Sequence, residues 1–302
     1  MLEESNKKMK KGMKDNIERK QPSINDVVMY KNFPLFSFIE LNINEICNRK
    51  CPFCPRVNPK VYPNQNIHMN MEIVRTIADQ LKDLNFTGIV NISGTGEPLL
   101  TKYIVDIVKE FGDRNIHVEI VTNGDTLTKK TGPQLVKDIY KAGLKQFVVS
   151  MYDGPEQIEY FNNLFNSCNI DKSLYSLRDR WYDESEDYGL LYTNRAGNIG
   201  FEHLSEIAKE KLIKSGKSAC FYTHYAMMID WNGDALICCQ DMYNRTVKFG
   251  NVKNKPLIEI WQDGKLTEFR NKLKNGDRLL SPCSNCNANG QVFGHNHAKV
   301  WK

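Results

Sequence analysis

Nine cysteines are the side chains of this 302-residue sequence with the most evident capacity for chemistry, and three of them stand close together. Cys47, Cys51 and Cys54 form a C-x3-C-x2-C spacing. Three thiolates this close can hold one compact inorganic centre. A structural zinc site needs four ligands, and His68, the nearest further candidate, lies beyond a proline-containing loop. Because a [4Fe–4S] cube held by three cysteines keeps one iron open for a small molecule, the spacing favours a catalytic iron–sulfur cluster.

A second group of cysteines, Cys220, Cys238, Cys283 and Cys286, lies in the last third of the sequence. Four thiolates are enough to close a second iron–sulfur site completely, although the spacing alone also permits zinc. Because nine is an odd number and no export signal is expected, a disulfide framework is disfavoured. The separation of the two groups predicts two distinct metal centres.

Two local patterns are expected to position the second group. The turn sequence 230–234 lies between two apolar runs and predicts a β-hairpin, which would bring Cys220 and Cys238 towards the same end. Apolar residues at helical spacing between 257 and 273 predict an amphipathic helix that leads to Cys283 and Cys286.

The elements around the first group follow from the spacing of apolar residues. After a strand predicted over 36–43, helices and strands alternate, with helices over 71–84, 101–112 and 134–142 and strands over 88–93, 117–122 and 146–151. Repeated strand–helix units predict an α/β fold, a partial (β/α)6 TIM-like barrel with a parallel sheet and helices outside. Ligand sites in such folds lie at the carboxyl ends of the strands, where this sequence places Gly94–Pro98, Asn123 and Ser150.

The run from Glu40 to Arg56, with its apolar strand and cysteine loop, resembles the first strand and cluster loop of radical S-adenosylmethionine (SAM) enzymes. The resemblance implies that the open iron chelates the amino and carboxylate groups of the methionine moiety of SAM. It also implies that Phe53 lies near the adenine. The loop after the second strand looks like the family's Gly-Glu-Pro motif, which holds the methionine amino group, and further polar residues look like those that meet the ribose and the carboxylate. The SAM-binding residues implied in this way are Phe53, Gly94, Thr95, Gly96, Glu97, Asn123 and Ser150.

The carboxyl-terminal part resembles the one-cluster "twitch" form of the SPASM domain found in this superfamily. The likeness implies two [4Fe–4S] clusters, one catalytic and one auxiliary. It divides the chain into a basic amino-terminal extension over 1–32, a partial barrel over 33–215 and a hairpin-plus-helix auxiliary domain over 216–302. Within the family, the chain is most similar to enzymes that act on sugars and aminocyclitols.

That resemblance implies a reaction. A 5′-deoxyadenosyl radical would abstract hydrogen from a carbinol C–H bond of a sugar or aminocyclitol, either free or linked to a nucleotide or carrier, and two-electron oxidation would give a ketone. Arg195 matches an arginine that contacts the substrate; because arginine stays protonated, anchoring is the safer role. Asp241 is a candidate base or orienting group.

Three other functions compete with oxidation. A redox-neutral epimerase would use Cys239 as a hydrogen-atom donor. Because neighbours on a strand point to opposite faces, Cys239 is not expected to share a cluster with Cys238. A peptide-modifying radical enzyme is the second alternative, and a non-catalytic zinc-binding module is the third. If the chain is a radical SAM enzyme, it requires an external reductant such as flavodoxin or ferredoxin.

The charge of the chain says little about partners. Residues 1–20 hold seven Lys or Arg against four Asp or Glu, so they contribute most of the net charge of +5. A solvated terminus is the expected interpretation. No basic stripe suggests nucleic acid, and no apolar run reaches the roughly 18 residues of a membrane span. A cytoplasmic protein that acts on a small molecule is therefore expected.

Overall fold

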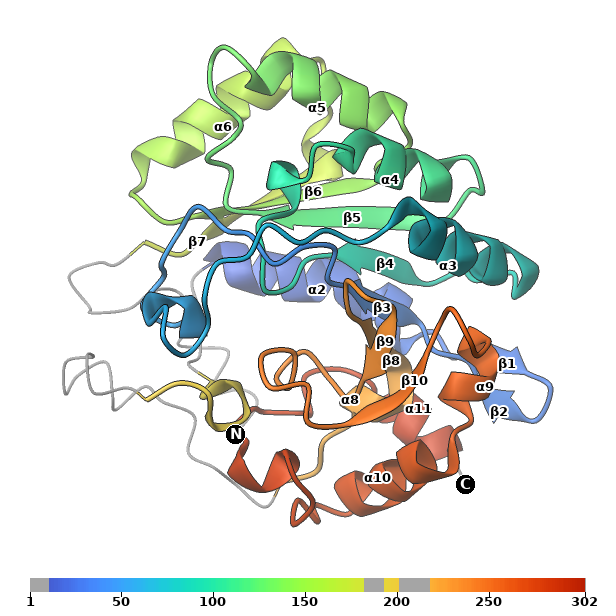
Figure 1. The fold of residues 1–302 in the computed structure, drawn as a ribbon. Coiled ribbons are helices and arrows are strands. Elements are labelled where there is room, and N and C mark those ends of the chain that lie inside the picture. Colours follow the sequence, from blue (N-terminus) through green and yellow to red (C-terminus); the bar gives the residue numbers. More distant parts are fainter. Residues whose placement is uncertain (1–10, 182–192, 201–217, 302) are drawn as a thin grey trace.

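The computed structural model describes residues 11–181, 193–200 and 218–301. Its centre is an eight-stranded sheet with the order β10-β9-β8-β3-β4-β5-β6-β7 (Figure 1). The strands from β3 to β7 are parallel and have the bounds β3 Phe38–Leu41, β4 Ile89–Ile92, β5 His117–Thr122, β6 Gln146–Met151 and β7 Tyr175–Asp179. The alternating strand–helix pattern of the sequence is confirmed.

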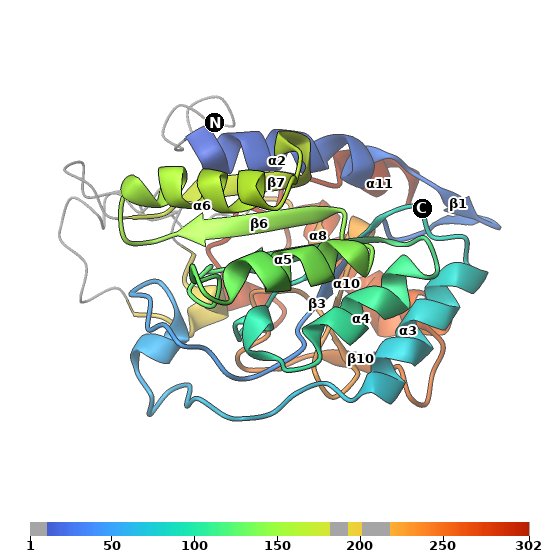
Figure 2. The same ribbon diagram turned by 90° about the horizontal axis from the view of Figure 1, so that it is seen from above.

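Helices cover the outer face of this sheet, as Figure 2 shows. Strands β4 and β6 are buried along their whole length, which explains their continuous apolar runs. Helix α3 begins after Asn70, whose side chain accepts a hydrogen bond from the backbone N–H of Glu72. The covering helices are α3 Met71–Asp83, α4 Ile104–Gly112, α5 Gly132–Lys141 and α6 Glu156–Ser167.

The carboxyl-terminal segment continues the same sheet. Strand β8 (Ala226–Ile229) pairs in parallel with β3, and β9 (Asp234–Leu236) and β10 (Lys248–Asn251) follow antiparallel. The turn between β8 and β9 is the predicted hairpin, in which Gly233 has a φ of +90° and donates its N–H to the carbonyl of Asp230. Helices α8 Tyr222–Tyr225, α9 Leu257–Trp261, α10 Gly264–Lys274 and α11 His295–Val300 surround the hairpin. The division at residue 216 remains a prediction.

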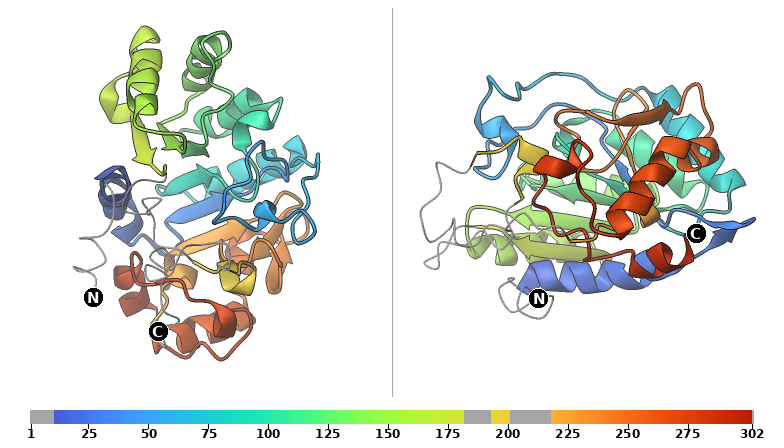
Figure 3. Two further views of the ribbon diagram at one scale, coloured as in Figure 1. Left: turned by 90° about the vertical axis from the view of Figure 1, so that its left-hand side faces the viewer. Right: turned by 90° about the horizontal axis from the view of Figure 1, so that it is seen from below.

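The expectation of a solvated amino-terminal extension is wrong for residues 11–25. They form helix α2 (Lys11–Asn25), which lies against β7, and the chain then passes through the short strands β1 (Met29–Tyr30) and β2 (Phe33–Pro34) (Figure 3). Asn16, Lys20 and Ile24 of this helix are buried. These buried residues are four positions apart, so they lie on one face of the helix. The segment therefore packs on the sheet through this face although its composition is polar. Among the described residues, no helix has both the length and the apolar character that a membrane span would need.

Candidate active site

The first three cysteines line one cavity of about 330 Å³ at the carboxyl ends of the parallel strands. We call it the three-cysteine cavity. Its lining also includes Phe38, Glu40, the loop from Ser93 to Glu97, Asn123, Ser150 and Arg195. Side chains that the sequence separates by more than 140 positions therefore meet around one space, as the geometry of a parallel barrel requires.

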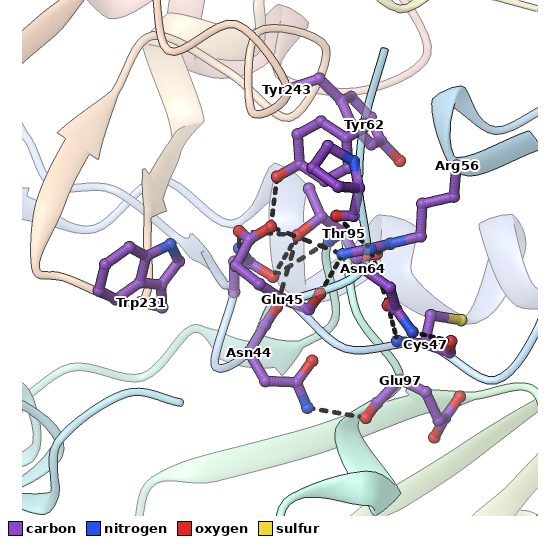
Figure 4. Close-up of polar contacts among 12 residues, drawn as sticks. Asn44, Glu45, Cys47, Arg56, Tyr62, Asn64, Thr95, Glu97, Trp231 and Tyr243 are labelled. Carbon is purple, nitrogen blue, oxygen red and sulfur yellow. Dashed lines mark hydrogen bonds and ion pairs between the residues drawn. The ribbon is translucent and has the colours of Figure 1, made fainter. Parts of the chain in front are cut away.

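Polar contacts hold the cysteine loop in place (Figure 4). Cys47 donates its backbone N–H to Oδ1 of Asn64 at 2.8 Å, and Nδ2 of Asn64 donates to the carbonyl of Cys47 at 3.0 Å. Arg56 is 3% exposed and donates from Nε to the carbonyl of Thr95 and from Nη2 to that of Glu45, both at 2.6 Å. Arg56 thus joins the cysteine loop to the loop after β4.

His68 does not complete a metal site with these cysteines. Its Nδ1 lies 3.1 Å from Oγ1 of Thr101, and its Nε2 lies 2.9 Å from Oδ1 of Asn66. Among the described residues, no group of three or more His, Cys, Asp or Glu side chains is arranged to hold a single metal ion. The three thiols instead share the wall of one cavity, which suits a cluster of several irons with one iron left open.

The glycines after β4 allow the backbone to come close to the cysteine loop. Gly94 has a φ of +139°, and a Cβ there would overlap the side chain of Asn42. A Cβ on Gly96 would overlap the amide of Asn44. Thr95, between them, donates its backbone N–H to Oδ1 of Asn42 at 3.0 Å. Glycine is therefore needed at both positions to bring this loop to the cavity wall.

Glu97 lines the three-cysteine cavity and already accepts three hydrogen bonds. Its Oε1 accepts from Leu99 N at 3.0 Å and from Thr122 Oγ1 at 2.6 Å, and its Oε2 accepts from Asn123 N at 2.8 Å. A carboxylate has about four acceptor positions, so one remains for an ammonium group. Burial raises the pKa of Glu97 to about 7, although the three hydrogen bonds oppose that shift.

Ser150 and Asn123 both line the three-cysteine cavity. Ser150 is 2% exposed and accepts a hydrogen bond from Nη2 of Arg178 at 2.9 Å. Arg178 also lines the cavity, and its buried Nε has no hydrogen-bond partner among the described residues. A guanidinium held in this way offers a partner for a carboxylate such as that of methionine. Phe53 stacks on Tyr152 with their ring centroids 5.9 Å apart, which gives the cavity an aromatic side.

The carboxyl-terminal cysteines line a second, mostly apolar cavity of about 300 Å³. We call it the hairpin cavity, and its lining contains Cys220, Cys238, Cys239, Cys283 and Cys286. Cys238 packs against the main apolar core, as Cys220 and Cys283 do, whereas Cys239 packs against a separate apolar group that includes Tyr62 and Tyr243. That Cys239 does not share a cluster with Cys238 stays a prediction.

Arg195 lies in the lining of the three-cysteine cavity, and Ala196 lies in that of the hairpin cavity. Both residues have positive φ, +48° and +54°, a conformation that costs a non-glycine residue about 1–2 kcal/mol. Asn194 fixes this turn: its backbone N–H donates to Oδ1 of Asn287 at 2.7 Å, and its Nδ2 donates to the carbonyl of Asn285, also at 2.7 Å. The segment that contains Cys283 and Cys286 therefore holds the loop of Arg195.

Asp241 is in neither cavity lining. It is fully buried, and its Oδ2 accepts the backbone N–H of Val247 at 3.0 Å. The structure therefore gives Asp241 a role in bracing a turn, and the prediction that it acts as a base is not supported by its position.

Sequence reasoning missed Glu40 as a site residue. Glu40 and Phe38 are the two residues that line both cavities, so the cavities adjoin at these side chains. Oε2 of Glu40 accepts from Tyr222 Oη at 2.9 Å, and Oε1 lies 3.4 Å from Ser93 Oγ. The apolar residues on either side of Glu40 in its strand were the only available signal, because a carboxylate inside such a run needs a polar surrounding.

Comparisons with known proteins agree with this geometry. The family model of the radical SAM superfamily matches residues 41–180, and that of the iron–sulfur cluster-binding SPASM domain matches residues 220–287. The chain is 29% identical over 260 residues to the S-adenosyl-L-methionine-dependent 2-deoxy-scyllo-inosamine dehydrogenase of Niallia circulans, a match that covers 84% of this chain and 93% of that protein.

Solved structures show the same likeness. The crystal structure of BtrN in complex with AdoMet and 2-DOIA superposes with a TM-score of 0.69 at 26% identity, covering 87% of this chain and 98% of that one. An open conformation of BtrN superposes with a TM-score of 0.59 at 24% identity and covers 84% of this chain and 93% of that one.

Proposed function

Because this chain belongs to the radical SAM superfamily and carries its SPASM iron–sulfur domain, we propose that it oxidises a carbinol carbon of an aminocyclitol or sugar to a ketone. It is a radical SAM oxidoreductase whose cofactors are SAM and two [4Fe–4S] clusters. The substrate class is proposed from the named activity of the Niallia circulans relative and from the polar lining of the three-cysteine cavity.

The residues of both cavities fit these groups. Cys47, Cys51 and Cys54 would hold the catalytic cluster, and Cys220, Cys238, Cys283 and Cys286 the auxiliary one. SAM with the reduced catalytic cluster would supply a hydrogen-atom abstractor at the first cavity, and the oxidised auxiliary cluster would supply an electron acceptor at the second. The remaining acceptor position of Glu97 suits the ammonium of SAM, and the guanidinium of Arg178 suits its carboxylate.

The observation that carries the proposal is the junction of the two cavities at Glu40. Oxidation of a carbinol removes one hydrogen atom, one proton and one further electron. A proton acceptor is therefore needed between the site of abstraction and the electron acceptor. The carboxylate of Glu40 occupies this junction, and Tyr222 orients it. In this proposal Glu40 takes the carbinol proton, and Arg195 donates a hydrogen bond to the substrate oxygen.

One observation supports epimerisation as a second candidate. Cys239 and Glu40 both line the hairpin cavity, so Cys239 lies near the junction of the cavities. A thiol in this position is placed to return a hydrogen atom to the substrate. Oxidation remains our proposal, because the four further cysteines of this cavity would hold an electron acceptor, which a redox-neutral epimerisation does not need.

The test is product analysis with 2-deoxy-scyllo-inosamine, SAM and a chemical reductant in deuterated water. Oxidation predicts one 5′-deoxyadenosine per ketone and a product that is two hydrogens lighter than the substrate. A product that keeps its composition and gains one deuterium, and whose formation stops in Cys239→Ser, would instead establish epimerisation. Flavodoxin or ferredoxin is the reductant proposed for the cell, and replacing the chemical reductant with either protein tests that part.

A further inference from the structure

Helix α2 covers the open side of the barrel. Strand β7 is the last strand of the sheet and pairs with β6 alone among the described strands. Gly12 donates its backbone N–H to Oδ1 of Asp179 at 3.0 Å, and a Cβ on Gly12 would overlap the carbonyl of Leu177. The helix therefore lies directly on the edge strand, as Figures 2 and 3 show.

From β7 the helix crosses the interior of the barrel. Arg19 donates to both carboxylate oxygens of Glu119 on β5, at 2.6 and 3.2 Å. Lys20 donates to Oδ1 of Asn91 on β4 at 3.0 Å, and its ammonium lies 5.0 Å from the ring centroid of Phe38 on β3. These contacts place α2 within the curve of the sheet and make it a wall of the interior.

One face of α2 meets both cavities. Ile17 is part of the lining of the hairpin cavity, and Lys20 is part of that of the three-cysteine cavity. Residues three apart in a helix lie on the same face. Helix α2 also lies outside both matched family domains, which begin at residues 41 and 220.

Lys20 is only 7% exposed, and contacts with two neighbouring strands hold its ammonium group in place. Asn91 accepts one of its three N–H bonds, and the carboxylate of Glu119 lies 3.5 Å from Nζ. The other charged groups that act on the ammonium are Arg19, Arg178 and Glu40, the last two of which line the same cavity. A fixed donor on a cavity wall selects for an acceptor atom on the molecule that enters.

We propose that helix α2 is a wall of the substrate-binding cavity and that Lys20 donates a hydrogen bond to a hydroxyl oxygen of the substrate. This inference rests on the proposed function, because it assumes a polyhydroxylated ring as the substrate. Lys20 is thereby a specificity-determining residue contributed by a segment that precedes both matched domains.

The experiment measures binding of 2-deoxy-scyllo-inosamine to the oxidised holoenzyme in the presence of SAM, where no turnover occurs. Lys20→Met should raise the dissociation constant of this probe by roughly tenfold to a hundredfold, as the loss of one charged hydrogen bond predicts, while SAM affinity is unchanged. Lys14→Met, on the exposed side of the same helix, is the matched control and should leave both constants unchanged. If Lys20→Met does not fold, Lys20→Gln removes the charge but keeps a polar side chain and should weaken the probe in the same direction.

The outcomes separate the two proposals. Equal probe affinity in wild type and the Lys20 variants overturns the inference and leaves the proposed function intact. Binding that depends on Lys20, without ketone formation after reduction, supports the inference and rejects the proposed oxidation. A wild-type holoenzyme that binds SAM but not the probe contradicts both the substrate class and the role of Lys20.

Discussion

At the scale of single residues, Glu97 combines three hydrogen bonds with a raised pKa of about 7. Burial is the main cause, because it penalises the charged form more than the three donors stabilise it. SAM carries an ammonium group, which prefers the carboxylate form of Glu97. In the proposed site, the protonation state of Glu97 would therefore control how well the methionine end of SAM is held.

We expect SAM affinity to rise with pH between about 6 and 8 as Glu97 loses its proton. Glu97→Gln should weaken SAM binding by roughly tenfold to a hundredfold, since a charged hydrogen bond contributes about 1.5–3 kcal/mol, and it should abolish this pH dependence. Equilibrium titration of SAM into the oxidised holoenzyme measures both effects. Glu72→Gln, in the first turn of α3, is the control. A pH dependence that persists in Glu97→Gln would assign it to another group.

Glu40 is the proposed proton acceptor of the reaction, because its carboxylate lines both cavities. Glu40→Gln should lower ketone formation at least a hundredfold, which is the smaller end of the usual contribution of a general base. Formation of 5′-deoxyadenosine should continue, so the ratio of 5′-deoxyadenosine to ketone rises. Ser93→Ala removes the long 3.4 Å contact to Glu40 and the hydrogen bond that Ser93 accepts from Asn91 at 2.6 Å, but it keeps the Glu40 carboxylate, so it should have a much smaller effect. Wild-type oxidation by Glu40→Gln would show that the base is elsewhere.

At the scale of elements, the turn that contains Arg195 depends on the segment that contains two auxiliary cysteines. Asn194 donates to Asn287 and to the carbonyl of Asn285, and Oδ1 of Asn194 lies 3.3 Å from the backbone N of Asn287. These hydrogen bonds offset the unfavourable positive φ of Arg195 and Ala196. The segment that contains Cys283 and Cys286 therefore also positions the turn that contains Arg195.

Asn194→Ala removes two of these three contacts, which contribute about 0.5–1.5 kcal/mol each. We expect KM for the substrate to rise roughly tenfold, with the iron content and SAM affinity unchanged. Steady-state kinetics with an iron determination on the same sample measures this. Asn275→Ala, at the exposed end of α10, is the control. Loss of auxiliary iron in Asn194→Ala would mean that the contact serves cluster assembly instead.

At the scale of the whole molecule, Glu119 ties the amino-terminal helix to the sheet. Its side chain is fully buried and lies between Arg19, Lys20 and His117. Burial acts against ionisation of Glu119, but the nearby positive charges and hydrogen bonds outweigh it and lower its pKa. A carboxyl group whose pKa is lower in the folded chain than in the unfolded chain stabilises the fold at any pH above its pKa in the unfolded chain. This stabilisation is lost as the pH falls towards its pKa in the folded chain.

Glu119→Gln should lower the free energy of unfolding by about 3–5 kcal/mol at neutral pH, because it leaves the buried Lys20 and the partly buried Arg19 without their carboxylate partner. Chemical denaturation of wild type and variant in the same cluster state measures the difference. The difference should shrink as the pH falls below the ordinary carboxyl pKa of 4.5. Glu110→Gln, which breaks a more exposed pair with Arg114, should change stability by less than about 1 kcal/mol. Equal stability of wild type and Glu119→Gln would show that the ion pairs of Glu119 do not hold α2 in place.

The sequence by itself determined the features that depend on local order. The spacing of Cys47, Cys51 and Cys54, the glycine loop before Glu97 and the alternation of strands and helices are all properties of short segments. Parallel strands bring their carboxyl ends to one edge, so the shared location of these residues followed from the pattern alone. The number of thiols at each centre also followed from the sequence, but their spacing left zinc open at the second centre, and the iron–sulfur assignment there came from the resemblance to the SPASM domain.

Only the tertiary structure decided which distant side chains meet. The placement of Glu40 at the junction of two cavities depends on the pairing of β8 with β3. The packing of Cys238 and Cys239 against two different apolar groups is likewise visible only in the folded chain. Helix α2 was read as solvated because its composition is polar, yet Glu119, 99 positions after Lys20, supplies the buried charge that compensates it. Contacts of this range arise from packing and leave no local signature in the sequence.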